Sequence, residues 1–252
     1  MPQAPAVASN ISRRPGEPWT RFAERVASAF GLVLLLVLIT YVLLSLTNYR
    51  EWPGVFTALA SSVSAVVALV SARAKHRTVR WAGRIAVIAV GLQIAAVASE
   101  KEGVLGASAL LQVGLLSVAA FAVLRAVLSE REVGFRTILG AVSVYLVLAL
   151  QFAYVYVAIE KLQSSPFFAG NPQLANGDYV FFSITTLTTT GYGNLVPAGQ
   201  PGKMLAGLEM FTGQLFVVTL IAGLVSLWVP GQRIRELRQS SETDDAAGHG
   251  PA

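Results

Sequence analysis

The segment best suited to chemistry in this sequence is residues 185–194, Thr-Thr-Leu-Thr-Thr-Thr-Gly-Tyr-Gly-Asn, which lies between two long apolar stretches. Its two glycines, Gly191 and Gly193, can adopt left-handed backbone dihedrals that a side chain would disfavour. Alternating the hand of the backbone along an extended segment turns successive carbonyl groups to the same side. Such a row of oxygens can replace the water shell of a cation. The spacing therefore predicts a main-chain cation site, to which the Thr189 hydroxyl adds a ligand at the inner end.

This segment closely resembles the signature of the tetrameric potassium channels, Thr-Val-Gly-Tyr-Gly-Asp, together with the threonine-rich run that precedes it. Two positions differ, because Thr190 stands where valine or isoleucine is usual and Asn194 replaces aspartate. The resemblance implies a selectivity filter with potassium ions at its carbonyl groups. Its ion-binding residues would be Thr189, Thr190, Gly191, Tyr192 and Gly193. One chain supplies one filter strand, so the resemblance also implies a homotetramer around the ion.

The composition of the chain is that of an integral membrane protein. Of its 252 residues, 54% are hydrophobic and only 13% are charged, about half the charged share of soluble proteins. The sequence contains no cysteine, which excludes disulfides, thiolate catalysis and zinc–thiolate sites. A net charge of +5 is compatible with nucleic-acid binding, but the placement of the basic residues favours a membrane topology instead.

Six apolar segments approach the ~20 residues needed to cross the hydrocarbon core of a bilayer. They lie at about 26–47, 55–73, 81–98, 104–128, 137–160 and 203–229. A shorter helix is expected from Tyr179 to about Thr188, and its length would require it to enter the membrane and turn back. The predicted fold is therefore an all-α membrane protein with six transmembrane helices, a re-entrant pore helix and a selectivity-filter loop.

The distribution of Lys and Arg predicts the orientation of these spans. With the N-terminus in the cytoplasm, only four of the 19 basic residues fall outside, namely Arg50, Lys101, Lys161 and Lys203. Cytoplasmic loops of membrane proteins carry the excess of positive charge. We therefore expect a multi-pass protein of the cell membrane with both termini cytoplasmic and the filter loop extracellular.

Four regions follow from this topology. We expect a cytoplasmic N-terminal tail at 1–25 and a four-helix peripheral transmembrane domain at 26–130. A pore domain at 131–230 would contain the outer helix, pore helix, filter and inner helix. A cytoplasmic C-terminal tail would occupy 231–252.

Residues around the filter are expected to support it. By the resemblance, Phe181 and Phe182 match the aromatic positions that pack behind the filter. In many relatives an aspartate at the position of Asn194 bonds to a tryptophan or carboxyl on the pore helix, where this chain has Phe181 and Thr185. We therefore predict that this charged strut is absent and that Phe181, Phe182 and Tyr192 support the filter by apolar packing.

Two residues of the last span allow alternative interpretations. Glu209 is an intramembrane carboxylate, which marks a functional candidate. It would face the back of the filter and accept a hydrogen bond from the pore helix, for instance from Thr185, or be a structural partner without a role in permeation. By the resemblance Gly213 falls at a gating-hinge position, although glycines in membrane helices also permit close packing.

The function implied by the resemblance is passive, selective conduction of potassium across a membrane. Its partners would be potassium ions, the lipid bilayer and identical chains, with no nucleic acid and no cofactor other than potassium ions in the filter. The departures at Thr190 and Asn194 keep open a non-selective cation channel of the same fold. A potassium transporter subunit is a further alternative, although such a transporter carries several filters in one chain. An enzyme would need clustered acid, base or metal-binding residues in or near the spans, and the sequence contains none.

Six spans also raise the question of voltage gating. A voltage sensor needs basic residues at every third position through the membrane. The fourth span contains only Arg125, within a turn of its cytoplasmic end. We therefore expect that no charged voltage-sensor helix gates this protein.

Overall fold

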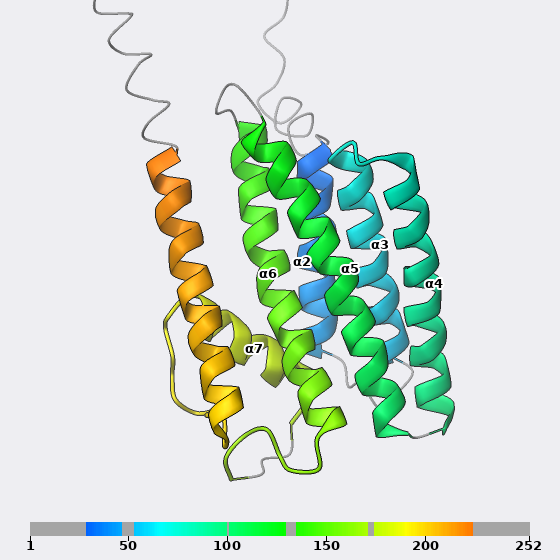
Figure 1. Ribbon diagram of the computed structural model, residues 1–252, viewed down its shortest axis with the longest axis vertical. Coiled ribbons are helices and arrows are strands. Elements are labelled where there is room, and N and C mark those ends of the chain that lie inside the picture. The colour runs from blue at the N-terminus through cyan, green and yellow to red at the C-terminus, as the bar shows by residue number, and fades with distance from the viewer. Residues whose placement is uncertain (1–28, 47–52, 100, 130–134, 171–173, 224–252) are drawn as a thin grey trace, which may run out of the picture.

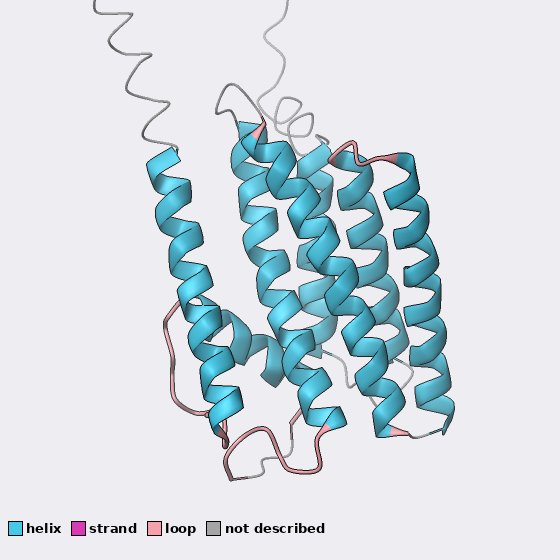
Figure 2. Cartoon of the chain, in the orientation of Figure 1, coloured by secondary structure: helices cyan, strands magenta, loops and turns pink. Residues whose placement is uncertain are grey.

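The structure is a computed structural model that describes residues 29–46, 53–99, 101–129, 135–170 and 174–223. Seven helices and no strand lie within these ranges, which confirms the predicted all-α fold (Figure 2). Six of the helices are α2 Ala29–Leu46, α3 Pro53–Ser71, α4 His76–Ser99, α5 Glu102–Leu128, α6 Phe135–Leu162 and α7 Asn176–Leu187. The seventh, Gln200–Gly223, is called the last helix below.

Five of these helices are long and apolar enough to cross a membrane, and α2 is a shorter apolar helix over its described residues. The helix boundaries differ by a few residues from those expected. The third span begins at His76 instead of Trp81, because the basic residues before Trp81 continue the helix beyond its apolar part. The tail predictions at 1–25 and 231–252, and the last span beyond Gly223, lie outside the described residues.

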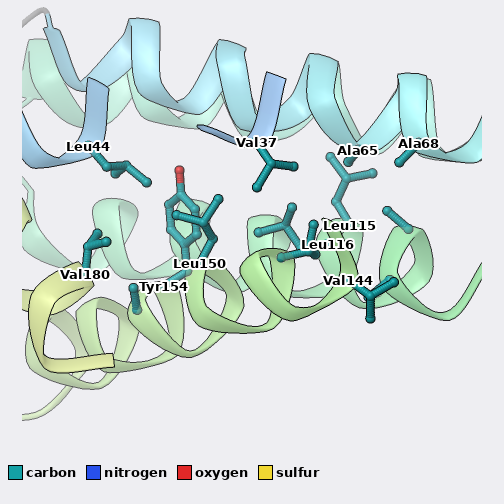
Figure 3. Close-up of a cluster of buried hydrophobic side chains, with 14 of the residues drawn as sticks. Val37, Leu44, Ala65, Ala68, Leu115, Leu116, Val144, Leu150, Tyr154 and Val180 are labelled. Atoms are coloured by element: carbon teal, nitrogen blue, oxygen red, sulfur yellow. The ribbon is translucent and has the colours of Figure 1, made fainter. Parts of the chain in front are cut away.

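Helices α2 to α6 form one bundle, shown in Figure 1, in which α5 packs against α3, α4 and α6. Its core consists of aliphatic side chains from α2, α3, α5 and α6 with Tyr154 among them, as Figure 3 shows. Polar side chains also cross this bundle. Ser61 of α3 bonds to the Tyr154 hydroxyl at 3.0 Å, and Gln112 of α5 donates to the Ala58 carbonyl at 3.0 Å. Interhelical hydrogen bonds of this kind are typical of packed membrane helices.

The short helix α7 lies between α6 and the last helix, at the end of the bundle opposite the α3–α4 loop (Figure 1). It has 12 residues and is about 18 Å long, too short to cross a bilayer. It begins three residues before the expected Tyr179. The Asp178 carboxylate accepts a hydrogen bond from the Ala175 N–H at 2.8 Å, which fixes the first turn.

Candidate ion-binding site

The chain after α7 has an alternating backbone. Positive φ angles occur at Thr189 (58°), Gly191 (53°) and Gly193 (75°), every second residue of the predicted filter. The two glycines have the left-handed dihedrals expected from the sequence. The positive φ of Thr189 was not indicated by the sequence, because a residue with a side chain is uncommon at positive φ. Its place two residues before Gly191 is the signal that would have suggested it.

One carbonyl group of α7 holds the start of this loop. The Thr185 carbonyl accepts hydrogen bonds from the N–H groups of Thr190 at 2.8 Å and Gly191 at 3.1 Å. The Thr189 N–H donates to the Thr186 carbonyl at 2.9 Å. The loop N–H groups therefore point back to the helix. Within the described residues, the carbonyl oxygens of residues 189–193 accept no hydrogen bond and are free to bind a cation.

The threonine hydroxyls of the loop differ in their partners. The Thr190 hydroxyl lies 2.9 Å from the Thr188 hydroxyl, so the unusual residue at this position is bonded within the loop. The Thr189 hydroxyl lies 3.5 Å from Nε2 of Gln214 on the last helix, at the limit of a hydrogen bond. Thr190 thus leaves the main-chain oxygens unoccupied, and Thr189 faces the last helix.

The structure places the predicted supporting aromatic residues at two different locations. Phe181 stacks on Tyr192, with ring centroids 5.6 Å apart and planes 19° apart. Phe182 instead lies in a buried aromatic cluster, 5.0 Å from the Tyr156 ring and 4.9 Å from the Phe168 ring. Of these two residues, only Phe181 therefore stacks on Tyr192, the tyrosine of the predicted filter. Phe182 holds α7 against α6 and the loop before α7.

Asn194 is exposed, and its side chain makes no hydrogen bond within the described part of the chain. The Thr185 hydroxyl donates to the Phe182 carbonyl of its own helix at 3.1 Å. These two residues are therefore not in hydrogen-bond contact. The absence of a charged strut behind the filter stays a prediction.

Glu209 is fully buried behind α7 and has two hydroxyl partners. Its carboxylate oxygens accept hydrogen bonds from Ser183 of α7 and Tyr156 of α6, each at 2.5 Å. The partner suggested from the sequence, Thr185, makes no hydrogen bond to it and donates to the Phe182 carbonyl instead. Ser183 and Thr185 are two residues apart and so face different sides of a helix of 3.6 residues per turn. Glu209 thus joins three helices at one point, and sequence reasoning missed both donors.

Gly213 occupies a tight contact between the last helix and α7. A Cβ atom there would lie 2.0 Å from the Leu187 carbonyl oxygen, which also accepts a hydrogen bond from the Tyr145 hydroxyl at 3.2 Å. At Gly207 and Gly223 a Cβ atom would meet nothing within 4 Å. The structure therefore gives a packing reason for Gly213. A role as gating hinge stays a prediction.

Charged and titratable side chains are few around the loop. No group of three or more His, Cys, Asp or Glu residues capable of holding a metal ion occurs in the described ranges. Tyr179 at the start of α7 is buried, and burial, followed by the nearby Glu160 and Asp178 carboxylates, raises the pKa of its hydroxyl. Tyr179 is therefore neutral. The ligands available for a cation are main-chain and hydroxyl oxygens, not carboxylates.

Comparison with known proteins finds similarity in the part of the chain that contains this loop. Residues 144–229 match the family model described as an ion channel. A cyclic nucleotide-gated potassium channel of Rhizobium etli is 32% identical over 91 residues, which cover 36% of this chain and 24% of the relative. The matching region thus spans about a quarter of that relative's length. Both matches support the family resemblance indicated by the sequence, and the similarity to an ion channel family lies in segment 144–229.

Proposed function

We propose that this protein is an ion channel that conducts potassium selectively and passively through a pore formed by four identical chains. The observation that carries the proposal is the alternating backbone at Thr189, Gly191 and Gly193, which leaves a row of carbonyl oxygens unbonded. Replacing the hydration shell of a cation by such oxygens is how potassium filters work. The Rhizobium etli relative is a potassium channel, which supports the same ion.

The surface of the single chain supports a tetramer. Residues 188–194 are all exposed in one chain, so a single filter strand has no opposing wall. The last helix also exposes large apolar side chains along its length, including Leu208, Phe211 and Leu215. Cyclic association of four copies would surround the ion with four strands and cover these helices.

The orientation we propose places both termini and the α3–α4 loop in the cytoplasm and the filter loop outside. The α3–α4 loop carries Arg73 and Lys75 and lies at the opposite end of the bundle from α7 (Figure 1). This separation agrees with the excess of positive charge in cytoplasmic loops. Gating by a charged voltage-sensor helix is not part of the proposal, because α5 carries a single basic residue in its last turn, the exposed Arg125.

The test is the reversal potential of the purified full chain in liposomes under opposing potassium and sodium gradients. We expect the wild type to reverse near the potassium equilibrium potential. Gly193→Ala should abolish selective current, because its φ of 75° is disfavoured for a residue with a β-carbon. Gly199→Ala is the matched control, since a Cβ atom there would meet only an ordinary contact at 3.7 Å.

A non-selective cation channel is the second candidate, favoured by Thr190 and Asn194, which depart from the usual signature. The same recording separates the two functions. Equal potassium and sodium permeability in the wild type would overturn potassium selectivity and leave cation conduction. Because the Thr190 hydroxyl bonds to Thr188, we expect the main-chain ligands, and with them the selectivity, to be preserved.

A further inference from the structure

An apolar groove of about 510 Å³ runs between α3 and α4, far from the filter. Its walls are aliphatic, and two glycines of α4 deepen it because they carry no side chain. The lining includes Leu59, Val63 and Val67 of α3 and Gly83, Val87 and Gly91 of α4. A Cβ atom at either glycine would meet nothing within 4 Å, so this space is open. Its width and chemistry suit a hydrocarbon chain.

The groove continues into a basic hollow at the end of the bundle opposite the filter loop. This hollow is lined by Arg80 and Arg84, and it shares Gly83 and Val87 with the groove. The Arg84 guanidinium lies 5.0 Å from the centre of the Trp81 ring, and tryptophan is enriched at the depth of lipid headgroups. The apolar groove and the basic hollow thus meet at the expected depth of the interface between the hydrocarbon core and the lipid headgroups.

Among the described residues, the positive charge on α4 and the α3–α4 loop has no acidic partner. Residues 53–99 contain five Arg and Lys residues and no Asp or Glu. No ion pair involves these basic residues among the described ranges. An anion supplied from outside the chain would therefore complement the hollow.

The position of α4 shows which surroundings this groove faces. In Figure 1, α4 lies at the side of the bundle opposite the last helix. It is also the least buried of the four long bundle helices. In a tetramer whose axis runs along the last helices, α4 faces away from the axis and into the bilayer.

We propose that an anionic phospholipid occupies this site, with one acyl chain in the α3–α4 groove and its phosphate between Arg80 and Arg84. The apolar length selects a lipid over a free phosphate, and the two arginines select an anionic headgroup over a zwitterionic one. Basic pockets between membrane helices bind anionic headgroups by the same combination. Such a lipid would fix the ends of α3 and α4 relative to each other.

The test is native mass spectrometry of the full chain in detergent, titrated with phosphatidylglycerol or phosphatidylcholine of identical acyl chains. We expect the wild type to bind phosphatidylglycerol about tenfold more tightly than phosphatidylcholine. The double change Arg80→Gln and Arg84→Gln should remove most of this preference. Arg125→Gln, at the same end of the bundle but outside the groove, should retain it. Equal preference in the double variant and this control would overturn the proposal.

A second pair of variants tests the apolar part with the charges intact. Gly91→Leu places a side chain in the groove and should weaken binding of both lipids several-fold. Gly114→Leu is the matched control, because Gly114 is an exposed α5 glycine where a Cβ atom would also meet nothing within 4 Å. Soluble glycerophosphoglycerol should not displace the lipid. Displacement at equal concentration would show a simple phosphate site and overturn the lipid assignment.

The remaining occupant of such a groove is a second copy of the chain. Because the sequence contains no cysteine, Val87→Cys introduces a single reporter into the groove. We expect no disulfide-linked dimer when membranes containing this variant are oxidised. Efficient cross-linking would show that α4 pairs with α4 of another copy, and would overturn the proposal.

Discussion

The peripheral bundle of α2 to α5 and the pore part, made of α6, α7, the following loop and the last helix, use polar groups in opposite ways. In the bundle, buried polar side chains bond mainly to one another or to neighbouring carbonyls, as Ser108 does with the Gln93 side chain at 2.9 Å. In the pore part, the side chains Ser183, Tyr156 and Glu209 hold the helices together, while the main-chain oxygens of the loop stay unbonded. The bundle satisfies most of its buried polar groups internally, although Nε2 of Gln93 has no hydrogen-bond partner among the described residues. The pore part leaves the carbonyl oxygens of residues 189–193 without a hydrogen bond.

One tight glycine from each region, Gly106 and Gly213, shows the same contrast, although Gly140 of α6, like Gly106, meets a side chain. A Cβ atom at Gly106 of α5 would lie 2.5 Å from a side-chain atom of Leu162. At Gly213 the obstacle is the main-chain oxygen of Leu187, 2.0 Å away. A leucine side chain can change its rotamer, whereas a carbonyl group at the end of α7 moves only with the helix. An added side chain is therefore tolerated less well at Gly213, beside the predicted filter, than at Gly106 in the bundle.

Gly213→Ala should have the largest effect of the changes considered, because the added methyl group pushes the last helix away from the end of α7. We expect loss of assembled, conducting protein, measured by size-exclusion chromatography and potassium flux into liposomes. Gly106→Ala should cost less, since Leu162 can repack. Gly207→Ala should be neutral, because a Cβ atom there meets nothing within 4 Å. A conducting, stably assembled Gly213→Ala protein would contradict the distinction between the two regions.

Glu209→Leu should be the next most damaging change, because it leaves the buried Tyr156 hydroxyl without its acceptor, whereas the Ser183 hydroxyl can still donate to the Ala149 carbonyl at 2.7 Å. We expect a loss of about 1–3 kcal/mol in stability, which is the usual cost of one unsatisfied buried polar group. The measurement is denaturation of the purified protein in detergent. Met210→Leu, at the neighbouring exposed position, is the control. Wild-type stability of Glu209→Leu would show that the three-helix contact contributes little.

Phe181→Leu removes the ring stacked on Tyr192 and should weaken the support of the filter by about 1 kcal/mol, the usual value of an aromatic pair. We expect a lower potassium to sodium permeability ratio, measured from reversal potentials. Asn194→Ala should leave the ratio unchanged, because its side chain has no hydrogen-bond partner in the described chain. If the alanine variant loses selectivity as well, the amide has a role across the subunit interface.

Gln112→Leu tests the peripheral bundle by the same kind of measurement. It removes hydrogen bonds to the Ala58 carbonyl and the Ser62 hydroxyl, both at 3.0 Å. Interhelical hydrogen bonds in membranes are worth about 0.6 kcal/mol on average. We expect a stability loss of this order and unchanged single-channel conductance. A changed conductance would mean that the bundle and the pore part are coupled through this contact.

Arg125→Gln should have the smallest effect. A charge that crosses the whole membrane field contributes about 2.3 kcal/mol per 100 mV, but Arg125 lies in the last turn of α5 and is exposed. We expect the curve of open probability against voltage in symmetric potassium to be shallow and unchanged by the substitution. A steep curve that flattens in the variant would show that α5 is a voltage sensor.

Hydropathy and the filter signature were sufficient to predict the helical fold and the backbone of the two filter glycines. They were less informative about helix ends, as at His76, because charged residues can extend a helix beyond its apolar part. The partners of Glu209 were not predictable, since the direction of Ser183 or Thr185 around α7 depends on how the helices pack. The separation of Phe181 from Phe182 has the same origin. Adjacent residues point about 100° apart on a helix, so only one of them reaches Tyr192.

The contact of Glu209 also bears on how the protein is made. Both of its donors, Tyr156 and Ser183, precede it in the sequence and are therefore synthesised first. When the last helix leaves the ribosome, α6 and α7 are already available to receive its carboxyl group. A carboxylate that would oppose insertion of this segment by itself becomes compatible with the bilayer once the earlier helices are in place. The order of synthesis thus matches the order in which the buried contact can form.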